Sequence, residues 1–473
     1  MRWHRASVGL LALLACGCGA GAGDVRPPAP ATGSSWLEPA STAPVDPVWW
    51  RAFGDPELDR LIAMARAGAP DLAVAEARLT EARAERDTAA GAALPQVGAS
   101  GTASENELSE NGEFPIARLP GFSRRFSLFD AGFDASWEVD FWGYQRHRIE
   151  AGEARAQAAR WNARDVEIAL TAELAQDYVD LRAAQARLAA VVAEAEARAA
   201  LRRLTALRLS AGEDALGSLA DARIEEAQAH QARAQTEAQV SAAAYRIAAL
   251  LGVAPETLVP GLRDTRAPVP VPPATIAMGI RSDLLERRPD VRRAERELAA
   301  AVADTAAAHA DLFPRISLLG SIGQQAQDAG NLVSPGSTRF SIGPGFSWPI
   351  FAGGRMRAQI RAANAREREA LARFDAAVTG ALSDSEGAAN RFAAAARARA
   401  EADRAAADAT RARKLAEARV LGGEDDRRAL ETALVTEARA TASASDAAAE
   451  DARAAVALYK ALGGGWSKPS PHR

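Results

Sequence analysis

Side chains that could perform chemistry are few in this sequence, and its two thiols stand out. Cys16 and Cys18 are the only cysteines, and both lie near the amino terminus. The rest of the chain therefore has no disulfide and no thiolate metal site. The histidines lack the i, i+4 spacing of a zinc-binding helix, and no lysine lies in the Gly-Lys-Ser/Thr context of a phosphate-binding loop. We expect no enzymatic activity, no cofactor and no metal.

The segment around the cysteines indicates export. A basic start, Met1–Arg5, precedes a largely apolar stretch, and Leu13–Cys16 resembles a bacterial lipobox. An apolar run of about ten residues is too short to cross a bilayer and is typical of a secretory signal. We predict lipidation of Cys16, with Cys18 as a poorer second register. The alternative is an ordinary cleaved signal with incidental cysteines. In bacterial lipoproteins, which this segment resembles, an Asp after the lipidated cysteine marks retention in the inner membrane; Gly17 occupies that position here, and the resemblance therefore favours the outer membrane.

Composition excludes some functions and favours long helices. The net charge is -4, from 57 basic and 61 acidic residues, and the signs are interspersed. No broad basic field for nucleic acid exists. Apolar residues make up 48 % of the chain but aromatic ones only 5 %, a composition that suits closely packed helices. Because no later segment is a long uncharged apolar run, any membrane crossing must use strands.

The chain contains two rough copies of one pattern. Ser136–Val139 corresponds to Ser347–Ile350, and the same offset of 211 residues relates Gly212–Asp214 to Gly423–Asp425 and Leu250–Gly252 to Ala461–Gly463. No insertion or deletion separates these anchors. Upstream, Asp71–Ala93 corresponds to Asp290–Leu312 with an offset of 219. Copies of equal length must reach the same height, which predicts a pseudo-symmetric assembly.

Two strongly alternating strands and two weaker ones are readable. Phe133, Trp137 and Val139 alternate with small or polar residues, as do Phe340 and Phe346 in the second copy. Such alternation over about ten residues is typical of a transmembrane β-barrel, although a soluble sheet packed on a helix alternates equally well. Four strands cannot close a barrel, because about eight is the workable minimum. Two, three or four chains would be needed, so the sequence predicts an oligomer.

Very long helices follow the strong strands. From Tyr144 to about Leu209, and from Met356 to about Leu421, there is no proline, and each stretch could extend on the order of 100 Å. We divide the chain into a signal peptide (1–15), a lipidated tether (16–47), a first repeat (48–252), a Pro-rich linker (253–281), a second repeat (282–466) and a disordered tail (467–473). Strands are expected at about 95–105, 126–139, 314–325 and 338–350, with helical hairpins over 140–252 and 352–463.

Six motifs resemble one family, the TolC-like outer-membrane efflux factors, and in particular the OprM-type (NodT-type) lipoprotein branch of RND tripartite efflux systems. The most specific motif is RSDLLERRPDV, Arg281–Val291. The others are WWRAFGDP at Trp49–Pro56, WEVDFWG at Trp137–Gly143, LFPRISL at Leu312–Leu318, WPIFAGGR at Trp348–Arg355 and LYKALGGGW at Leu458–Trp466.

The resemblance implies a mainly helical chain with a membrane β-barrel part. Three chains would contribute four strands each to one twelve-stranded barrel, continued by a long periplasmic helical tunnel. The expected function is the passive exit duct that conducts drugs or other toxic small molecules from the periplasm to the exterior. The implied partners are two further chains of the same kind, a periplasmic adaptor (membrane fusion protein), an inner-membrane RND pump and outer-membrane lipid.

Two alternative functions remain open from the sequence. One is the outer-membrane duct of a type I protein secretion system. The other is a structural, envelope-spanning helical rod without a pore. The lipobox and the RSDLLERRPDV motif favour the efflux duct, whereas the substrate cannot be read from the chain.

The family resemblance also implies where the chain meets the adaptor and where it is gated. The adaptor-contact tips would be the turns between long and return helices, with Arg208, Leu209, Gly212, Arg419, Val420 and Gly423. Relatives narrow the tip with Leu and Asp at positions five and nine residues past the second glycine. Here those positions hold Arg428 and Thr432, with Glu431 adjacent, while Asp221 occupies the nine-residue position of the first copy. We hypothesise a gate of Asp221, Arg428, Glu431 and Thr432, closed partly by salt bridges.

Overall fold

A computed structural model describes residues 35–37, 41–109 and 123–466. The expected signal peptide, both cysteines and the tail at 467–473 lie outside the described residues. The chain forms two compact units. The strand unit comprises, among the described residues, Glu85–Arg155 and Glu297–Leu371; the helical unit lies within Thr32–Ala84, Ala156–Arg296 and Ala372–Arg473.

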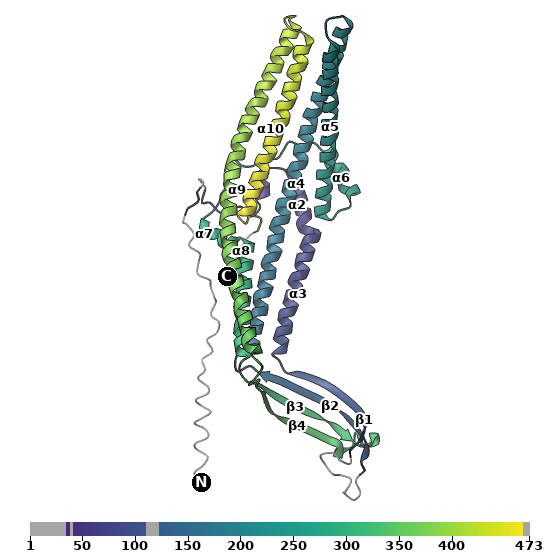
Figure 1. The fold of residues 1–473 in the computed structure, drawn as a ribbon, viewed down its shortest axis with the longest axis vertical. Coiled ribbons are helices and arrows are strands. Elements are labelled where there is room, and N and C mark those ends of the chain that lie inside the picture. Colours follow the sequence, from purple (N-terminus) through teal and green to yellow (C-terminus); the bar gives the residue numbers. More distant parts are fainter. Residues whose placement is uncertain (1–34, 38–40, 110–122, 467–473) are drawn as a thin grey trace. The chain divides into compact units, whose positions relative to one another are not determined.

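The strand unit contains an antiparallel sheet with the order β1-β2-β3-β4 (Figure 1). Its strands are β1 (Gln96–Glu107), β2 (Arg125–Val139), β3 (Arg315–Ala326) and β4 (Thr338–Ser347). Phe133 lies opposite Ile322, which in turn lies opposite Phe340. The two copies therefore meet along β2 and β3, although a helical excursion of the chain separates these strands in sequence.

The register sorts the side chains of the sheet onto two different faces. Successive side chains of a strand point to opposite faces, so Phe133, Ile322 and Phe340 share one face with Trp137, Leu318, Ile342 and Phe346. This apolar face is open: Phe340 is 77 % exposed and Phe346 80 % exposed. The opposite face carries small and polar residues, among them Ser100, Asp134, Ser321 and Ser341. Leu319 is an apolar exception on that face.

A glycine pair lies at the centre of the sheet. Gly132 and Gly323 face each other across β2 and β3. A Cβ added at Gly323 would lie 2.6 Å from the carbonyl oxygen of Ala131, and one added at Gly132 would lie 2.7 Å from that of Ile322. The strands can approach this closely only because both residues lack a side chain.

The helical unit is built around two helical hairpins. Helices α4 (Tyr144–Ser210) and α9 (Arg355–Leu421) each span 67 residues, as the equal-length duplication predicts. Their return helices are α5 (Leu216–Leu251) and α10 (Arg427–Ala461). Figure 1 shows α5 beside α4 and α10 beside α9. The remaining helices are η1 (Trp49–Phe53), α2 (Pro56–Gly68), α3 (Pro70–Ala92), α6 (Pro255–Asp264), α7 (Arg281–Arg287) and α8 (Pro289–Ala310), with the short turns η3 (Ala329–Asn331) and η4 (Pro335–Ser337) beside β4.

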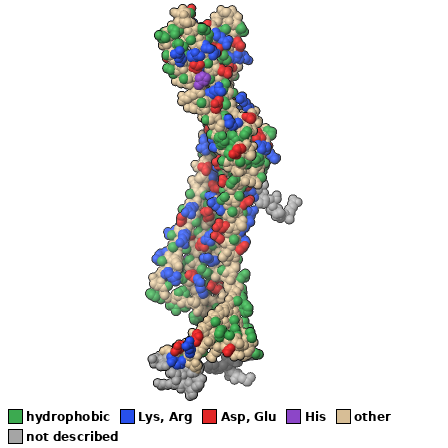
Figure 2. Space-filling model, turned by 90° about the vertical axis from the view of Figure 1, so that its right-hand side faces the viewer, with side chains coloured by type: hydrophobic (Ala, Val, Ile, Leu, Met, Phe, Trp, Pro, Cys, Tyr) green, Lys and Arg blue, Asp and Glu red, His purple; other side chains and the backbone are tan. Residues whose placement is uncertain are grey.

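The same ion pair joins both hairpins. Arg202 on α4 contacts Glu226 on α5 at 2.7 Å, and Arg413 on α9 contacts Glu437 on α10 at 2.9 Å. The two pairs are related by the 211-residue offset, so the duplication extends to the side chains. Figure 2 shows acidic and basic side chains interspersed over the helices of the visible face. A surface of this kind has no large field of one sign.

The core of the helical unit lies where the short helices cover the long ones. Asp55 caps α2 by accepting hydrogen bonds from the backbone N–H groups of Glu57 and Leu58. The apolar face of α2, Leu58, Leu61 and Ile62, is buried as the sequence pattern predicts, and each such side chain contributes roughly 2 kcal/mol on burial. Trp49 of the WWRAFGDP motif stacks on Tyr459 of the LYKALGGGW motif, with ring centroids 5.0 Å apart.

The expected linker at 253–281 is not uniformly irregular, because α6 forms within it. Pro255 begins this helix, and Leu258, Val259 and Leu262 are buried. Fully buried Arg182 of α4 donates to the Thr265 carbonyl that follows α6 at 2.5 Å, and to the Tyr178 hydroxyl at 2.9 Å. Tyr178 in turn donates to Asp55 at 2.7 Å. Packing therefore orders a proline-rich segment that composition alone describes as a loop.

Candidate functional site

The two hairpin tips have nearly the same backbone. Gly212 has φ +80° and Gly423 has φ +74°, a left-handed conformation that glycine adopts without strain. In each tip the N–H of the residue after the glycine donates to a carbonyl of the last helical turn. Glu213 donates to Arg208 at 2.8 Å, and Glu424 donates to Arg419 at 2.9 Å. All six residues expected to contact the adaptor lie in or next to these two turns.

Each tip contains an ion pair of its own, and in the second tip Arg419 also lies 3.8 Å from Glu424. Arg208 lies 3.9 Å from Asp214, and Arg419 lies 3.0 Å from Asp425. These pairs occupy equivalent positions in the two copies. They close each turn within its own hairpin, so they do not join the hairpins to each other.

At the tips, two further ion pairs join one hairpin to the other. Arg428 of α10 lies 3.7 Å from Asp214, and Arg208 lies 3.9 Å from Asp426. We call Arg208, Asp214, Asp426 and Arg428 the tip clasp. The positions equivalent to Asp426 and Arg428 in the first copy hold Ala215 and Gly217. The clasp therefore depends on residues in which the copies have diverged.

The surroundings of Asp214 favour the ionised form of its carboxyl group. Its carboxylate accepts hydrogen bonds from the Ser218 side chain and the Ala215 N–H, and the guanidinium groups of Arg428 and Arg208 lie nearby. These contacts lower the pKa of Asp214 below its ordinary value. The clasp carboxylate is thus ionised at neutral pH.

The four residues expected in the gate do not form one cluster in the single chain. Arg428 pairs with Asp214; Glu431 is only 3 % exposed and pairs with Arg427 of its own helix at 2.7 Å. Thr432 donates from its hydroxyl to the Arg428 carbonyl at 2.8 Å. Asp221 is exposed and forms no ion pair with the described residues. A gate formed between chains is not tested by one chain, so this assignment stays a prediction.

Sequence reasoning missed Asp214 as the partner of Arg428 and Asp426 as the partner of Arg208. The available signal was the repeated Gly-Glu-Asp triplet, in which Asp214 and Asp425 are equivalent. That triplet marks the turns but does not reveal that Asp214 also reaches the other hairpin.

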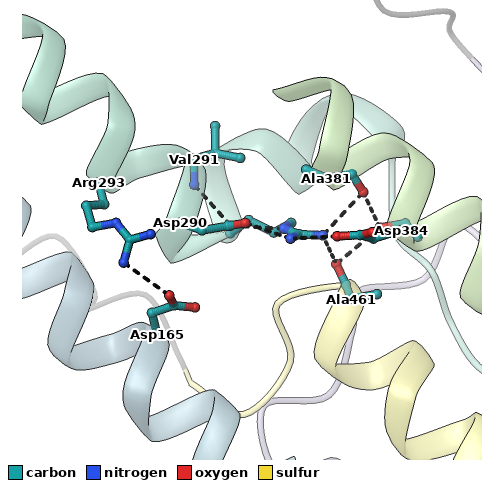
Figure 3. A network of polar contacts seen from close by, with 9 residues as sticks. Asp165, Asp290, Val291, Arg293, Ala381, Asp384 and Ala461 are labelled. Atoms are coloured by element: carbon teal, nitrogen blue, oxygen red, sulfur yellow. Dashed lines mark hydrogen bonds and ion pairs between the residues drawn. The ribbon is translucent and has the colours of Figure 1, made fainter. Parts of the chain in front are cut away.

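Arg288 of the RSDLLERRPDV motif anchors the second hairpin; Figure 3 labels its partners Asp290, Ala381 and Ala461. Its guanidinium donates to both carboxylate oxygens of Asp290, at 3.0 and 2.6 Å. It also donates to the carbonyls of Ala461 and Ala381, at 3.1 and 3.3 Å. Ala461 is the last residue of α10, where a cation is favoured by the free carbonyls. One side chain thus joins the start of α8 to α9 and to the end of α10.

The pKa values of two carboxyl groups at this anchor are shifted in opposite directions. Burial opposes ionisation of Asp290, but hydrogen bonds from Arg288 and from the Val291 N–H keep its pKa below the ordinary value. Burial raises the pKa of Asp165, and the charge of Asp290 adds to that effect. Arg293 lies 3.4 Å from Asp165 and offsets only part of it. Ionisation of Asp290 therefore stabilises the anchor, whereas ionisation of Asp165 destabilises it.

The described residues contain no arrangement of three or more His, Cys, Asp or Glu side chains that could hold a metal ion. None of the helices in the described part of the chain is both long enough and apolar enough to cross a membrane.

Comparison with known proteins identifies relatives over nearly the whole chain. The family model described as "Outer membrane efflux protein" matches residues 61–253 and 280–464. The pyoverdine export outer membrane protein OpmQ of Pseudomonas putida is 32 % identical, over 98 % of this chain and 97 % of its own length. The outer membrane protein OprJ of Pseudomonas aeruginosa is 30 % identical, over 97 % of this chain and 95 % of its own length.

A solved structure shares the fold. The outer-membrane channel OprN superposes with a TM-score of 0.82 at 32 % identity, covering 94 % of this chain and 99 % of that one. The Campylobacter jejuni CmeC channel superposes with a TM-score of 0.85 at 20 % identity, which concerns the fold alone. The matches cover both hairpins and all four strands.

Proposed function

This chain belongs to the outer membrane efflux protein family and is an outer-membrane efflux channel; we propose that it acts as a trimer. In the trimer the three sheets would join edge to edge into one barrel, and the three pairs of hairpins would form a tunnel. The chain would be a passive duct with no catalytic role. Its substrates would be drugs or other toxic small molecules; among the similar proteins, one is named for fusaric acid resistance and another for solvent efflux.

The main support for this proposal is that the sheet of a single chain has unpaired edges and one exposed apolar face. Among the described residues β1 and β4 each have a strand on one side only. Unpaired edges expose a row of backbone donors and acceptors, which a bilayer does not satisfy. One face is apolar and exposed while the other is small and polar. A closed ring of such sheets would pair every edge, present its apolar face to lipid and enclose its polar face.

The hairpin tips and the amino terminus are the parts of the chain that would contact the proposed partners. The two turns centred on Gly212 and Gly423 would meet a periplasmic adaptor, which would join the duct to an inner-membrane RND pump. Exposed apolar residues near them support a protein contact, among them Leu216 and Leu421, 77 % and 83 % exposed. A lipid on Cys16, or on Cys18, would fasten the chain to the outer membrane. Mass spectrometry of the mature amino terminus decides between the two cysteines.

The tip clasp would contribute to the closed state of the duct. It holds the α4–α5 hairpin to the α9–α10 hairpin through exposed ion pairs, each of which contributes little by itself. Weak, reversible contacts of this kind suit an element that must open when an adaptor binds. Arg428 would then serve the gate through Asp214, with Asp221 and Thr432 on the adjoining helix surfaces and Glu431 buried beside Arg427.

Planar bilayers test the proposed function directly. The purified full chain is expected to give discrete single-channel openings and to run as a trimer in detergent. A helical rod would show no conductance. A secretion duct would conduct as well, but deletion of the gene would then block export of a protein rather than raise sensitivity to toxic small molecules.

A further inference from the structure

The polar face of the sheet carries an ion pair near the end at which β3 leads into β4. Asp130 on β2 and Arg339 on β4 lie on the same face, because their neighbours Gln325 and Gly323 on β3 are two residues apart. The Nε of Arg339 lies 2.7 Å from one carboxylate oxygen of Asp130, and a terminal nitrogen lies 2.5 Å from the other. Gln325 donates a third hydrogen bond to Asp130 at 2.9 Å. The Asp130 carboxylate is thereby held in place and neutralised.

The glycines of β2 and β3 make this pairing possible. Arg339 must reach across β3 at Gly323 to contact a residue two strands away. With no side chain at Gly132 or Gly323, the backbone there is bare and the guanidinium can extend over it. The ion pair is therefore built into the sheet geometry and is not an incidental surface contact.

A second acid of this face, Asp134, is not neutralised in the same way. Its carboxylate accepts a hydrogen bond from Ser100 on β1 at 2.9 Å, and it forms no ion pair within the described residues. Along β2 the polar face thus carries one balanced pair at Asp130 and, four residues further on at Asp134, one acid in excess for each chain. No charged side chain interrupts the apolar face at this level, where Phe133, Ile322 and Phe340 lie.

We propose that the Arg339–Asp130 pair sets the ion selectivity of the strand part of the channel, with Asp134 supplying the net negative charge. This inference rests on the proposed function, in which the polar face lines the conduit. Three chains would place three copies of each charge at one level of the pore. Rings of charged side chains favour ions of opposite sign. Arg339 cancels one ring of acids, so the pore prefers cations only moderately.

Substitutions of the two members of the pair should shift the ion preference in opposite directions, which a merely structural role would not produce. Arg339→Gln removes the cation and leaves Asp130 uncompensated, so the preference for potassium over chloride should increase. Asp130→Asn leaves Arg339 uncompensated, so the preference should shift toward chloride. The double variant removes both charges and should return close to wild type. Each single shift should be at least about twofold in the permeability ratio at low ionic strength, where charges act over roughly 30 Å.

Arg125 offers a matched control in the same sheet. It pairs with Glu105 at 2.6 Å, but its register places it on the face that carries Phe129 and Phe133. That face would point away from the conduit. Arg125→Gln removes the same charge from the same sheet and should leave the permeability ratio unchanged.

The experiment measures reversal potentials of the full-length trimer in planar bilayers across a potassium chloride gradient of about 10 to 30 mM. If Arg339→Gln fails to assemble, Arg339→Lys keeps the charge and should show the wild-type ratio, while Asp130→Asn still tests the opposite shift. Opposite shifts in the two single variants support the proposal. Variant channels that conduct with an unchanged permeability ratio, or with shifts of the same sign, would overturn the selectivity proposal but not the proposed function. A wild-type protein without conductance would overturn the proposed function as well.

Discussion

The indole N–H of Trp348 donates a hydrogen bond to the backbone carbonyl of Leu312 at 3.1 Å. Trp137 makes the equivalent bond to Ala93 at 3.0 Å. The tryptophans are 211 residues apart and their acceptors 219, the two offsets that relate the copies. Each tryptophan ties the end of the second strand of its copy to the residues before the first strand. The duplication thus preserves a specific contact as well as a length.

This equivalence predicts equal effects of Trp137→Phe and Trp348→Phe. Phenylalanine keeps an aromatic ring but has no N–H to donate. Each variant should lose at most about 1 kcal/mol of unfolding free energy. Thermal unfolding of the detergent-solubilised protein, followed by circular dichroism, measures both. A large loss in one variant only would show that the two junctions are not equivalent.

Gly323→Ala should weaken the sheet where Gly343→Ala does not. A methyl group at position 323 would lie 2.6 Å from the Ala131 carbonyl oxygen, whereas nothing lies within 4 Å of one at position 343. Overpacking of this kind typically costs about 1 to 3 kcal/mol. The trimer fraction in detergent and its melting temperature report the difference. Equal behaviour of the two variants would contradict the close approach of β2 and β3.

Arg428→Ala should make the channel open more readily. The substitution removes the cation that holds Asp214 to the other hairpin. We expect an increase on the order of twofold or more in open probability in planar bilayers, since exposed pairs are individually weak. Arg411→Ala is the control, because Arg411 pairs with Asp408 on its own helix. An unchanged conductance and open probability in the Arg428 variant would exclude the clasp from gating.

The clasp should respond to salt but not to mild acid. The pKa of Asp214 lies below its ordinary value, so the carboxylate stays charged from neutral pH down to about pH 4. Ionic strength, in contrast, screens exposed pairs directly. Open probability of the wild type should therefore increase with salt at pH 7 and stay constant from about pH 8 to pH 5. In the Arg428→Ala variant the salt response should be smaller.

The Arg288 anchor should depend on pH through two carboxyl groups with opposite signs. The pKa of Asp290 is lowered, so its ionised form adds stability that is present above about pH 4 and lost as the pH falls. Asp290→Asn leaves the largely buried Arg288 without its closest carboxylate partner and should cost about 3 kcal/mol at pH 7. That cost should shrink below about pH 4.

Asp165→Asn is the matched comparison at the same anchor. The pKa of Asp165 is raised, so its ionisation opposes folding as the pH rises. A neutral amide avoids this penalty, and the variant should be as stable as the wild type or slightly more stable at pH 7. Unfolding midpoints between about pH 3 and pH 8 measure both variants. Similar losses in both at neutral pH would contradict the assigned directions.

Local sequence patterns accounted for the elements and much of their spacing. Alternation around Phe133 and Phe340 indicated strands where β2 and β4 lie, because the period of two is a local property of a strand. The absence of proline and the glycines at Gly212 and Gly423 marked two helices that prove equal in length. Helix α6 within the linker was harder to predict. Its formation depends on the burial of Leu258 and Leu262, which no local sequence pattern indicates.

The duplication, the strand faces and the positions of the tips could be predicted from the chain alone, because each depends on residues that are neighbours in sequence. The pairing of charges could not, because it depends on three-dimensional packing. Asp214 and Arg428 are 214 residues apart in sequence, and their 3.7 Å contact exists because hairpin packing brings the two tips together. Arg339 reaches Asp130 for a similar reason, since strand pairing places β2, β3 and β4 side by side. A charge finds its partner through packing, and packing is not encoded in any single segment.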